Sequence, residues 1–140
     1  MRVTISAVVR APAQLVRDVY LDYAHWSGVF PTISAVRLRQ RVGPTLVLAV
    51  DHDEGTVINE MTPRADGTVE LLEIKRHYDA VFVNRFRPVP AGTLVTIRGR
   101  LWFKGFARLL DPLLYWYVRR LMRRLQLQPV KARAESVPSR

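Results

Sequence analysis

Apolar and polar side chains alternate along most of the first hundred residues, and this period of two predicts β-strands. Residues 3–9 place valine, isoleucine and alanine side chains on one side of an extended segment. Residues 32–42 alternate more clearly, because Arg37, Arg39 and Arg41 face away from the apolar positions, as in a strand with one face in water. The predicted strands are residues 3–9, 32–42, 45–50, 56–61, 68–76, 80–87 and 93–103.

Short turns separate most of these strands, so we expect an antiparallel sheet. Gly43-Pro44 follows the second strand, and Asp66-Gly67 is a typical hairpin sequence. Prolines and a glycine within residues 88–92 separate the last two strands. Connections this short do not carry a crossover between parallel strands.

The spacing of apolar residues becomes helical soon after the first strand. Residues 12–20 place Leu15 and Val19 on one helical face, and Pro12 suits a first turn, where its missing N–H costs nothing. Residues 22–30 are either irregular or a second short helix.

From Lys104 onward the apolar positions predict a long amphipathic helix. Asp111-Pro112 suits a cap and a first turn, so we expect a kink or restart there, and Pro129 is expected to end the helix or bend the chain. We therefore expect one domain over residues 1–128 and a frayed tail over residues 129–140. The residues of the predicted packed face are Leu110, Leu114, Tyr117, Val118, Leu121 and Leu125.

Together these elements indicate an α+β domain in which a seven-stranded antiparallel sheet wraps round one long C-terminal helix. The helix is the obvious cover for the apolar face of the sheet. A strongly curved sheet can leave an apolar cavity beneath such a helix, and small-molecule sites prefer such places.

The order of elements and several local sequences resemble the START-like, or Bet v 1-like, helix-grip fold of the SRPBCC superfamily, in its polyketide cyclase/dehydrase-like branch. The resemblance covers about residues 3–136, and the stretch from Asp22 to Pro31 is also similar to coenzyme-Q-binding relatives. It implies the fold but no single activity, because the family includes lipid carriers, quinone-binding proteins, plant hormone receptors and aromatase/cyclases. The residues that carry it are Val9-Arg10-Ala11-Pro12, Val19, Asp22, Trp26, Phe30-Pro31, Val36, Gly92-Thr93, Gly105 to Leu114 and Leu127 to Glu135.

Composition excludes several classes of site. The 140 residues contain no cysteine, so disulfides, thiol catalysis and thiolate metal sites are ruled out. Three histidines at unrelated spacings indicate no metal, and scattered glycines form no phosphate loop, so we expect no cofactor. The apolar runs are too short to span a membrane and the first residues are not typical of a signal peptide, so a cytoplasmic location is expected.

The charge is strongly basic, at +10, and residues 104–140 carry +7 of it. One interpretation is a solvated basic face, since 19 arginines against 3 lysines is typical of a GC-rich genome. The other is an anionic membrane surface that binds the basic C-terminal helix, where Tyr115, Trp116 and Tyr117 lie among the arginines. No nucleic-acid partner is expected because no helix-turn-helix or RNA-binding strand pattern is present. The oligomeric state stays open.

We find no convincing catalytic constellation. Asp51-His52-Asp53-Glu54 is interpreted as a solvated turn, since adjacent residues at a strand end point to opposite faces. Single polar residues on apolar strands are candidate ligand contacts, with plain exposure as the alternative. The residues expected to line the cavity are Trp26, Phe30, Leu48, Ile58, Glu60, Leu72, Tyr78, Phe82, Asn84, Phe86, Ile97, Leu110, Leu114 and Tyr117.

Three functions are compatible with this sequence. The first is a protein that binds a small hydrophobic molecule, such as a lipid, a quinone or a polyketide, in the cavity. The second is an aromatase/cyclase-type enzyme in which Glu60, Tyr78 or Asn84 assists enolisation and loss of water, provided that two of them converge. The third is a lipid-transfer or membrane-surface protein that docks through its basic helix.

Overall fold

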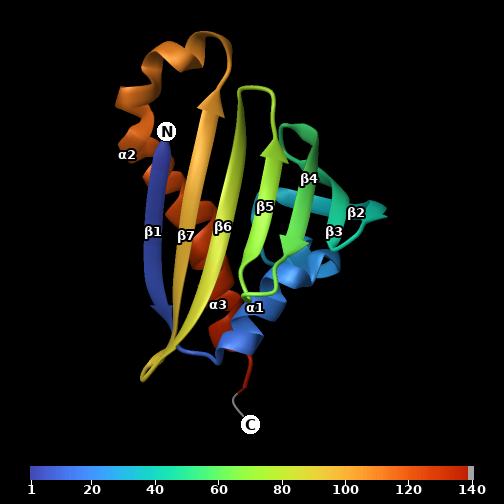
Figure 1. Cartoon of the computed structure of the whole chain (residues 1–140), viewed down its shortest axis with the longest axis vertical. Coiled ribbons are helices and arrows are strands. Elements are labelled where there is room, and N and C mark those ends of the chain that lie inside the picture. The colour runs from blue at the N-terminus through green and yellow to red at the C-terminus, as the bar shows by residue number, and fades with distance from the viewer. Residues whose placement is uncertain (139–140) are drawn as a thin grey trace.

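A seven-stranded antiparallel sheet forms the body of the protein in the computed structural model, which describes residues 1–138 (Figure 1). The strand order is β1-β7-β6-β5-β4-β3-β2, so β1 and β2 are the two edges of the sheet. The strands are β1 (Arg2–Val9), β2 (Ile33–Val42), β3 (Thr45–His52), β4 (Gly55–Pro63), β5 (Val69–Ile74), β6 (Tyr78–Val89) and β7 (Gly92–Phe103).

Helices connect the two edge strands and cover one face of the sheet. The short helix α1 (Ala13–Leu21) and the 3₁₀ helix η1 (Tyr23–Gly28) carry the chain from β1 to β2 across the lower end of the sheet in Figure 1. After β7 the chain forms η2 (Gly105–Leu110), α2 (Asp111–Met122), a π-helical turn η3 (Arg123–Leu127) and α3 (Gln128–Ser136). The expected helix-grip arrangement is therefore confirmed.

Two glycines lie where neighbouring segments of the chain approach too closely for a side chain. A Cβ atom on Gly92 would lie 2.2 Å from the carbonyl oxygen of Val9, and its φ of 142° is one that only glycine adopts freely. A Cβ atom on Gly99 would lie 3.0 Å from the Phe82 ring and 3.1 Å from Cε of Met122. Gly99 thus lets the C-terminal helix approach β7.

The C-terminal helix continues beyond Pro129, which corrects the expected frayed tail. Within η3 the backbone N–H of Gln128 bonds to the carbonyl of Arg123, and this wider turn accommodates the ring of Pro129. Beyond it, Val130 and Ala134 are fully buried, and Glu135 accepts a 3.0 Å hydrogen bond from the backbone N–H of Arg10. Residues 129–136 are therefore part of the domain. The last two residues of the expected tail lie outside the described residues.

The arginines of the last two long strands lie on the convex face of the sheet, away from the helix. Arg85, Arg98 and Arg100 are exposed there, and the guanidinium of Arg100 lies 5.0 Å from the centre of the Trp102 ring. The opposite, concave face carries the core, in which Ile5, Phe82 and Ile97 are buried beneath the C-terminal helix.

Candidate functional site

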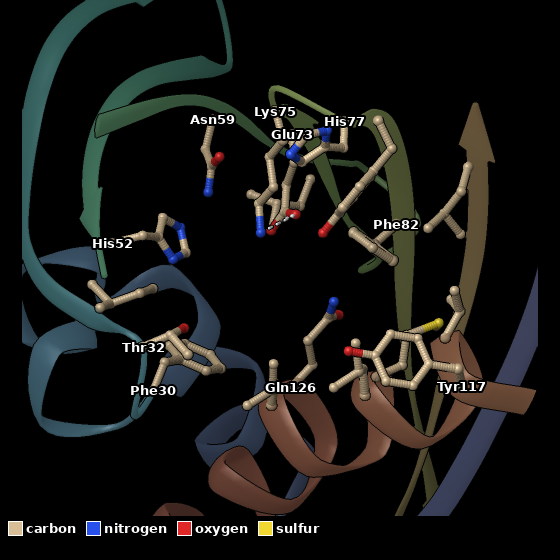
Figure 2. Close-up of a pocket in the computed structure, with 18 of the residues that line it drawn as sticks. Phe30, Thr32, His52, Asn59, Glu73, Lys75, His77, Phe82, Tyr117 and Gln126 are labelled. Atoms are coloured by element: carbon tan, nitrogen blue, oxygen red, sulfur yellow. Dashed lines mark ion pairs between the residues drawn. The ribbon is translucent and has the colours of Figure 1, made fainter. Parts of the chain in front are cut away.

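A cavity of about 260 Å³ lies between the concave face of the sheet and the C-terminal helix (Figure 2). Its floor comes from β3 to β7, one side from η1 and the start of β2, and its roof from η2, α2 and η3. The lining residues are Tyr20, Trp26, Phe30, Thr32, Ile33, His52, Asn59, Leu71, Glu73, Lys75, His77, Tyr78, Phe82, Asn84, Leu101, Phe103, Ala107, Leu114, Tyr117, Val118, Leu121, Met122, Leu125 and Gln126.

Most of the wall is apolar and firmly held. The rings of Trp26 and Phe30 meet edge to face with centroids 5.7 Å apart, a favourable arrangement for aromatic pairs. The indole N–H of Trp26 donates a 3.0 Å hydrogen bond to the carbonyl of Tyr20, so its only polar atom is satisfied. Trp26 therefore both fills the core and forms part of the cavity wall. An apolar ligand would find a preformed surface here.

Charged and polar side chains gather on the sheet side of the cavity. Glu73, at the end of β5, and Lys75, just beyond it, place a carboxylate oxygen and an ammonium nitrogen 3.6 Å apart. The Lys75 nitrogen also lies 5.4 Å from the centre of the Tyr78 ring. In Figure 2 Glu73 and Lys75 point from the sheet toward the helix that carries Tyr117 and Gln126. Within residues 1–138 no cluster of three or more metal-ligating side chains occurs.

Burial and mutual contact change the acidities in this group. Burial raises the pKa of Glu73, and the nearby ammonium of Lys75 opposes that change only in part. Burial by itself would lower the pKa of Lys75, but Glu73 and Tyr78 outweigh it and the pKa is raised. Burial also raises the pKa of Tyr78. Burial and then the charge of Lys75 lower the pKa of His52, so its imidazole is neutral at pH 7. The site thus holds a cation beside a neutral imidazole.

Four polar atoms of the lining are buried without a hydrogen-bond partner among residues 1–138. They are the hydroxyl of Tyr20, Nε2 of His52, Oδ1 of Asn59 and Oδ1 of Asn84. The amide nitrogen of Asn84 donates to the carbonyl of Val69 at 3.1 Å, and this bond leaves its oxygen free to accept. A buried polar atom without a partner costs about 1–3 kcal/mol, so a ligand that supplies the partner gains affinity.

Half of the residues expected from the sequence line the cavity and half do not. Those that line it are Trp26, Phe30, Tyr78, Phe82, Asn84, Leu114 and Tyr117. Those that lie outside the lining are Leu48, Ile58, Glu60, Leu72, Phe86, Ile97 and Leu110.

Strand phase explains three of the seven residues outside the lining. Glu60 pairs with Leu72 across β4 and β5, while the adjacent pair of Asn59 and Glu73 faces the cavity. Because neighbouring residues in a strand point to opposite faces, Glu60, Ile58 and Leu72 lie on the other face of the sheet. Glu60 is therefore not available for chemistry in the cavity.

The other four expected residues lie outside the lining because of where they pack in the fold. Leu48 and Ile97 lie on the concave face but are fully buried in the core. Phe86 packs against Tyr20 with ring centroids 5.4 Å apart. Leu110, the last residue of η2, is 36% exposed and does not line the cavity.

The most polar part of the site was not predicted from the sequence. In β5 both alternating sets of residues contain leucine and glutamate, so the pattern favours neither Glu70 nor Glu73 as the buried one. His52 lies in the segment interpreted as a solvated turn. That description fits Asp53 and Glu54, which are exposed between β3 and β4, whereas Asp51, which pairs with Arg37 at 2.7 Å, and His52 are the last two residues of β3. His52 alone of these turns into the cavity, at the end of β3. The sequence contains no signal that separates it from Asp51.

A family model described as polyketide cyclase / dehydrase and lipid transport matches residues 1–135 of the chain. This match reaches into α3, in agreement with the packed helix found there. No curated protein gives a significant match to the sequence.

Solved structures with the same fold include the Zhui aromatase/cyclase from Streptomyces sp. R1128. It superposes with a TM-score of 0.77 at 16% identity, over 96% of this chain and 93% of that one. A START superfamily protein from Mycobacterium smegmatis gives a TM-score of 0.69 at 13% identity, over 98% and 99% of the two chains. The di-domain aromatase/cyclase BexL gives a TM-score of 0.75 at 19% identity. The superposition covers 99% of this chain and 51% of BexL.

Proposed function

Since this chain belongs to the polyketide cyclase/dehydrase and lipid transport family, we propose that its cavity binds a small hydrophobic molecule with oxygen functions at one end. The membership confirms the resemblance seen in the sequence. The observation that carries the proposal is an apolar cavity whose sheet side holds Glu73, Lys75 and His52 together with unpartnered amide oxygens. Apolar pockets with a few convergent polar groups are the usual form of ligand sites.

The size of the cavity favours a compact ligand. Ligand pockets commonly measure about 300–1,000 Å³, and the volume of about 260 Å³ lies just below that range. A quinone or a folded polyketide-like ring system suits this space better than a lipid with two long chains. Carbonyl oxygens of such a ligand would accept from Lys75, and hydroxyl groups would donate to Asn59 and Asn84.

A fluorescent hydrophobic probe tests the binding. Titration with 1-anilinonaphthalene-8-sulfonate should give saturable fluorescence with the native protein. Leu114→Trp, which puts a larger side chain into the lining, should weaken this binding about tenfold or more, or by about 1.4 kcal/mol, because the added ring occupies space that the probe would fill. The matched control Val42→Trp adds the same ring at an exposed position near the β2–β3 turn and should bind like the wild type. Unsaturable binding, or equal binding by both variants, contradicts the proposal.

A second candidate is an aromatase/cyclase-type enzyme, and the convergence of Glu73, Lys75 and His52 favours it. Enolisation needs a base that removes a proton from the carbon beside a ketone and a cation or donor that stabilises the enolate oxygen. His52 or Glu73 would be the base and the Lys75 ammonium the stabilising group. Of the residues suggested by the sequence, Tyr78 and Asn84 lie in the same cavity and Glu60 does not.

Proton exchange separates the enzyme from the carrier. If the site promotes enolisation, a cyclic β-diketone in D₂O should exchange its α-protons faster with the protein than without it. Lys75→Met should remove most of that acceleration, whereas Val42→Trp should leave it unchanged. A ketone that binds but exchanges at the uncatalysed rate supports the carrier and rejects the enzyme.

A further inference from the structure

The N-terminal part of the C-terminal helical segment carries an exposed apolar surface. Phe106 and Leu109 in η2 and Leu113 and Trp116 in α2 are 72–79% exposed. We call these four residues the docking face. Tyr117 and Leu110 of the same segment are exposed to a smaller extent, and the other exposed large apolar side chains among residues 1–138, such as Val42 and Ile74, are less exposed and lie on the strands or near the chain end.

The spacing places these residues on one side of the molecule. Leu109, Leu113 and Trp116 follow one another at intervals of four and three, which is one face of a helix. Contiguous apolar surface of this kind is costly in water and marks interaction sites. In Figure 1 this segment lies at the upper end of the molecule, beside the N-terminus and beyond the end of β7.

Arginines surround the docking face. Arg120 follows Trp116 by four residues and Arg124 follows Arg120 by four, so both continue the same helical face, and Arg108 lies between the two η2 members. All three are exposed, and no acidic group among residues 1–138 lies within ion-pair distance of them. Asp111 is the acidic residue of this segment, and it lies 3.7 Å from the N-terminal ammonium.

We propose that the docking face binds the surface of an anionic lipid bilayer, with its apolar side chains at the boundary between headgroups and acyl chains and Arg108, Arg120 and Arg124 on lipid phosphates. A tryptophan and a phenylalanine beside arginines on one helical surface suit the interface between headgroups and hydrocarbon. The net charge of +10 attracts the chain to an anionic surface. No helix among residues 1–138 is long and apolar enough to cross a membrane, so the contact is peripheral.

Charge argues against a second copy of the chain as the occupant. A two-fold contact through the docking face would bring Arg108, Arg120 and Arg124 of both protomers into one interface. Like charges held together in an interface are unfavourable, whereas lipid phosphates complement them.

The docking face borders the cavity. Ala107 of η2 and Tyr117 of α2 line the cavity, and each is adjacent in sequence to a member of the docking face. Tyr117 is itself 59% exposed, so it lies at the rim. Docking would place that rim at the membrane, where an apolar ligand is stored. This last step rests on the proposed ligand binding, whereas the docking itself does not.

Vesicle co-sedimentation tests the proposal. The full-length protein should bind vesicles of phosphatidylcholine with about 30% phosphatidylglycerol, and should bind pure phosphatidylcholine far more weakly. Arg120→Glu/Arg124→Glu should weaken binding about 30-fold or more. The matched control Arg87→Glu/Arg98→Glu makes the same change of net charge on the convex face and should lose much less. Equal losses by both double variants, or no binding to anionic vesicles, overturn the proposal.

The depth of the apolar side chains gives an independent readout. Leu113→Ser/Trp116→Ser should weaken binding about tenfold or more, because two apolar contacts with the bilayer are lost. Brominated lipids should quench tryptophan fluorescence of the bound wild type, and Trp116→Phe should still bind while losing most of that quenching. If the wild type sediments as a dimer that Leu113→Ser/Trp116→Ser dissociates, a second copy covers the face and the proposal is wrong. A loss of probe binding in the cavity with intact vesicle binding would reject the proposed function alone.

Discussion

At the scale of single residues, the polar chemistry of the cavity depends on which way one strand faces. Glu73 and Lys75 are two residues apart near the end of β5, so both side chains reach the cavity. Burial removes both charges from water, and the attraction between them offsets only part of the free energy that this desolvation costs. The cost of a buried ion pair is a reason to expect that these residues serve ligand binding rather than stability.

The pH dependence of stability tests this pair. Burial raises the pKa of Glu73 above its ordinary value of 4.5, so the folded state holds its proton more tightly than the unfolded state, and stability is lost as pH rises through that range. Lys75→Met removes the compensating cation, so the variant should lose stability relative to wild type by about 1–3 kcal/mol more at about pH 8 than at about pH 5. His52 adds to this difference between the variant and the wild type. The charge of Lys75 contributes to the lowered pKa of His52, so Lys75→Met makes protonation of His52 less costly near pH 5 and leaves it neutral near pH 8.

Urea unfolding at a series of pH values measures this effect. The double variant Glu73→Gln/Lys75→Met has no carboxylate at position 73, so most of the extra pH dependence of stability seen in Lys75→Met should disappear. If the stability of Lys75→Met changes with pH in the same way as that of the wild type between about pH 5 and pH 8, Glu73 is not a buried carboxylate that Lys75 partly compensates.

Gly92 is the residue at which the backbone leaves least freedom. Gly92→Ala would place a Cβ atom 2.2 Å from the Val9 carbonyl oxygen at a φ of 142°, so we expect a loss of about 2–4 kcal/mol in the free energy of unfolding. Gly28→Ala is the matched control, because no atom lies within 4 Å of its added Cβ and its φ is not positive. Equal stabilities of the two variants, measured by urea unfolding, would falsify this account of the turn.

At the scale of elements, the C-terminal helical segment divides its tasks along its length. The docking face lies at its start, the cavity roof in its middle, and a packed anchor at its end. The anchor is α3, which contacts α1 and buries Val130 and Ala134. A π-helical turn joins roof and anchor without a break in the helix. One continuous element therefore connects the exposed surface to the core.

Removal of α3 tests its role as an anchor. A chain that ends at residue 128 should lose about 3–5 kcal/mol of stability, because Val130 and Ala134 and the Glu135 bond to Arg10 are lost. Arg133→Ala changes an exposed residue of the same helix and should cost less than about 0.5 kcal/mol. Thermal and urea unfolding provide the measurements. If the shortened chain is as stable as the wild type, the packing of α3 does not contribute to the free energy of unfolding.

At the scale of the whole molecule, sheet and helix enclose a cavity that a ligand can fill. A ligand that binds only the folded state stabilises it by mass action, by about 2.7 kcal/mol when its concentration is a hundred times its Kd. For a chain of this size that corresponds to a rise in Tm of about 5–10 °C. We expect 1-anilinonaphthalene-8-sulfonate or a short quinone to produce such a rise in the wild type and not in Leu114→Trp. A rise that is the same in both would place the ligand outside the cavity.

The sequence by itself determined the elements and their order. The period-two pattern and the turn residues predicted seven strands, and each lies within a few residues of its predicted place. The helical spacing after Lys104 predicted the cover of the sheet. These features follow from local rules, because burial of one face sets the period of a strand or a helix.

The tertiary structure alone decided which polar side chains enter the cavity and where the chain stays exposed. Both phases of β5 are equally apolar, so only pairing with β4 turns Glu73 inward and Leu72 outward. Pro129 was expected to end the helix or bend the chain, and the helix instead continues through a π-helical turn into α3, whose packing against α1 outweighs the local cost of a proline. Phe106, Leu113 and Trp116 are apolar in sequence yet exposed in the structure, because they lie on the side of the helical segment that does not face the cavity. Local patterns record that a residue is apolar, whereas the position of its neighbours determines whether anything covers it.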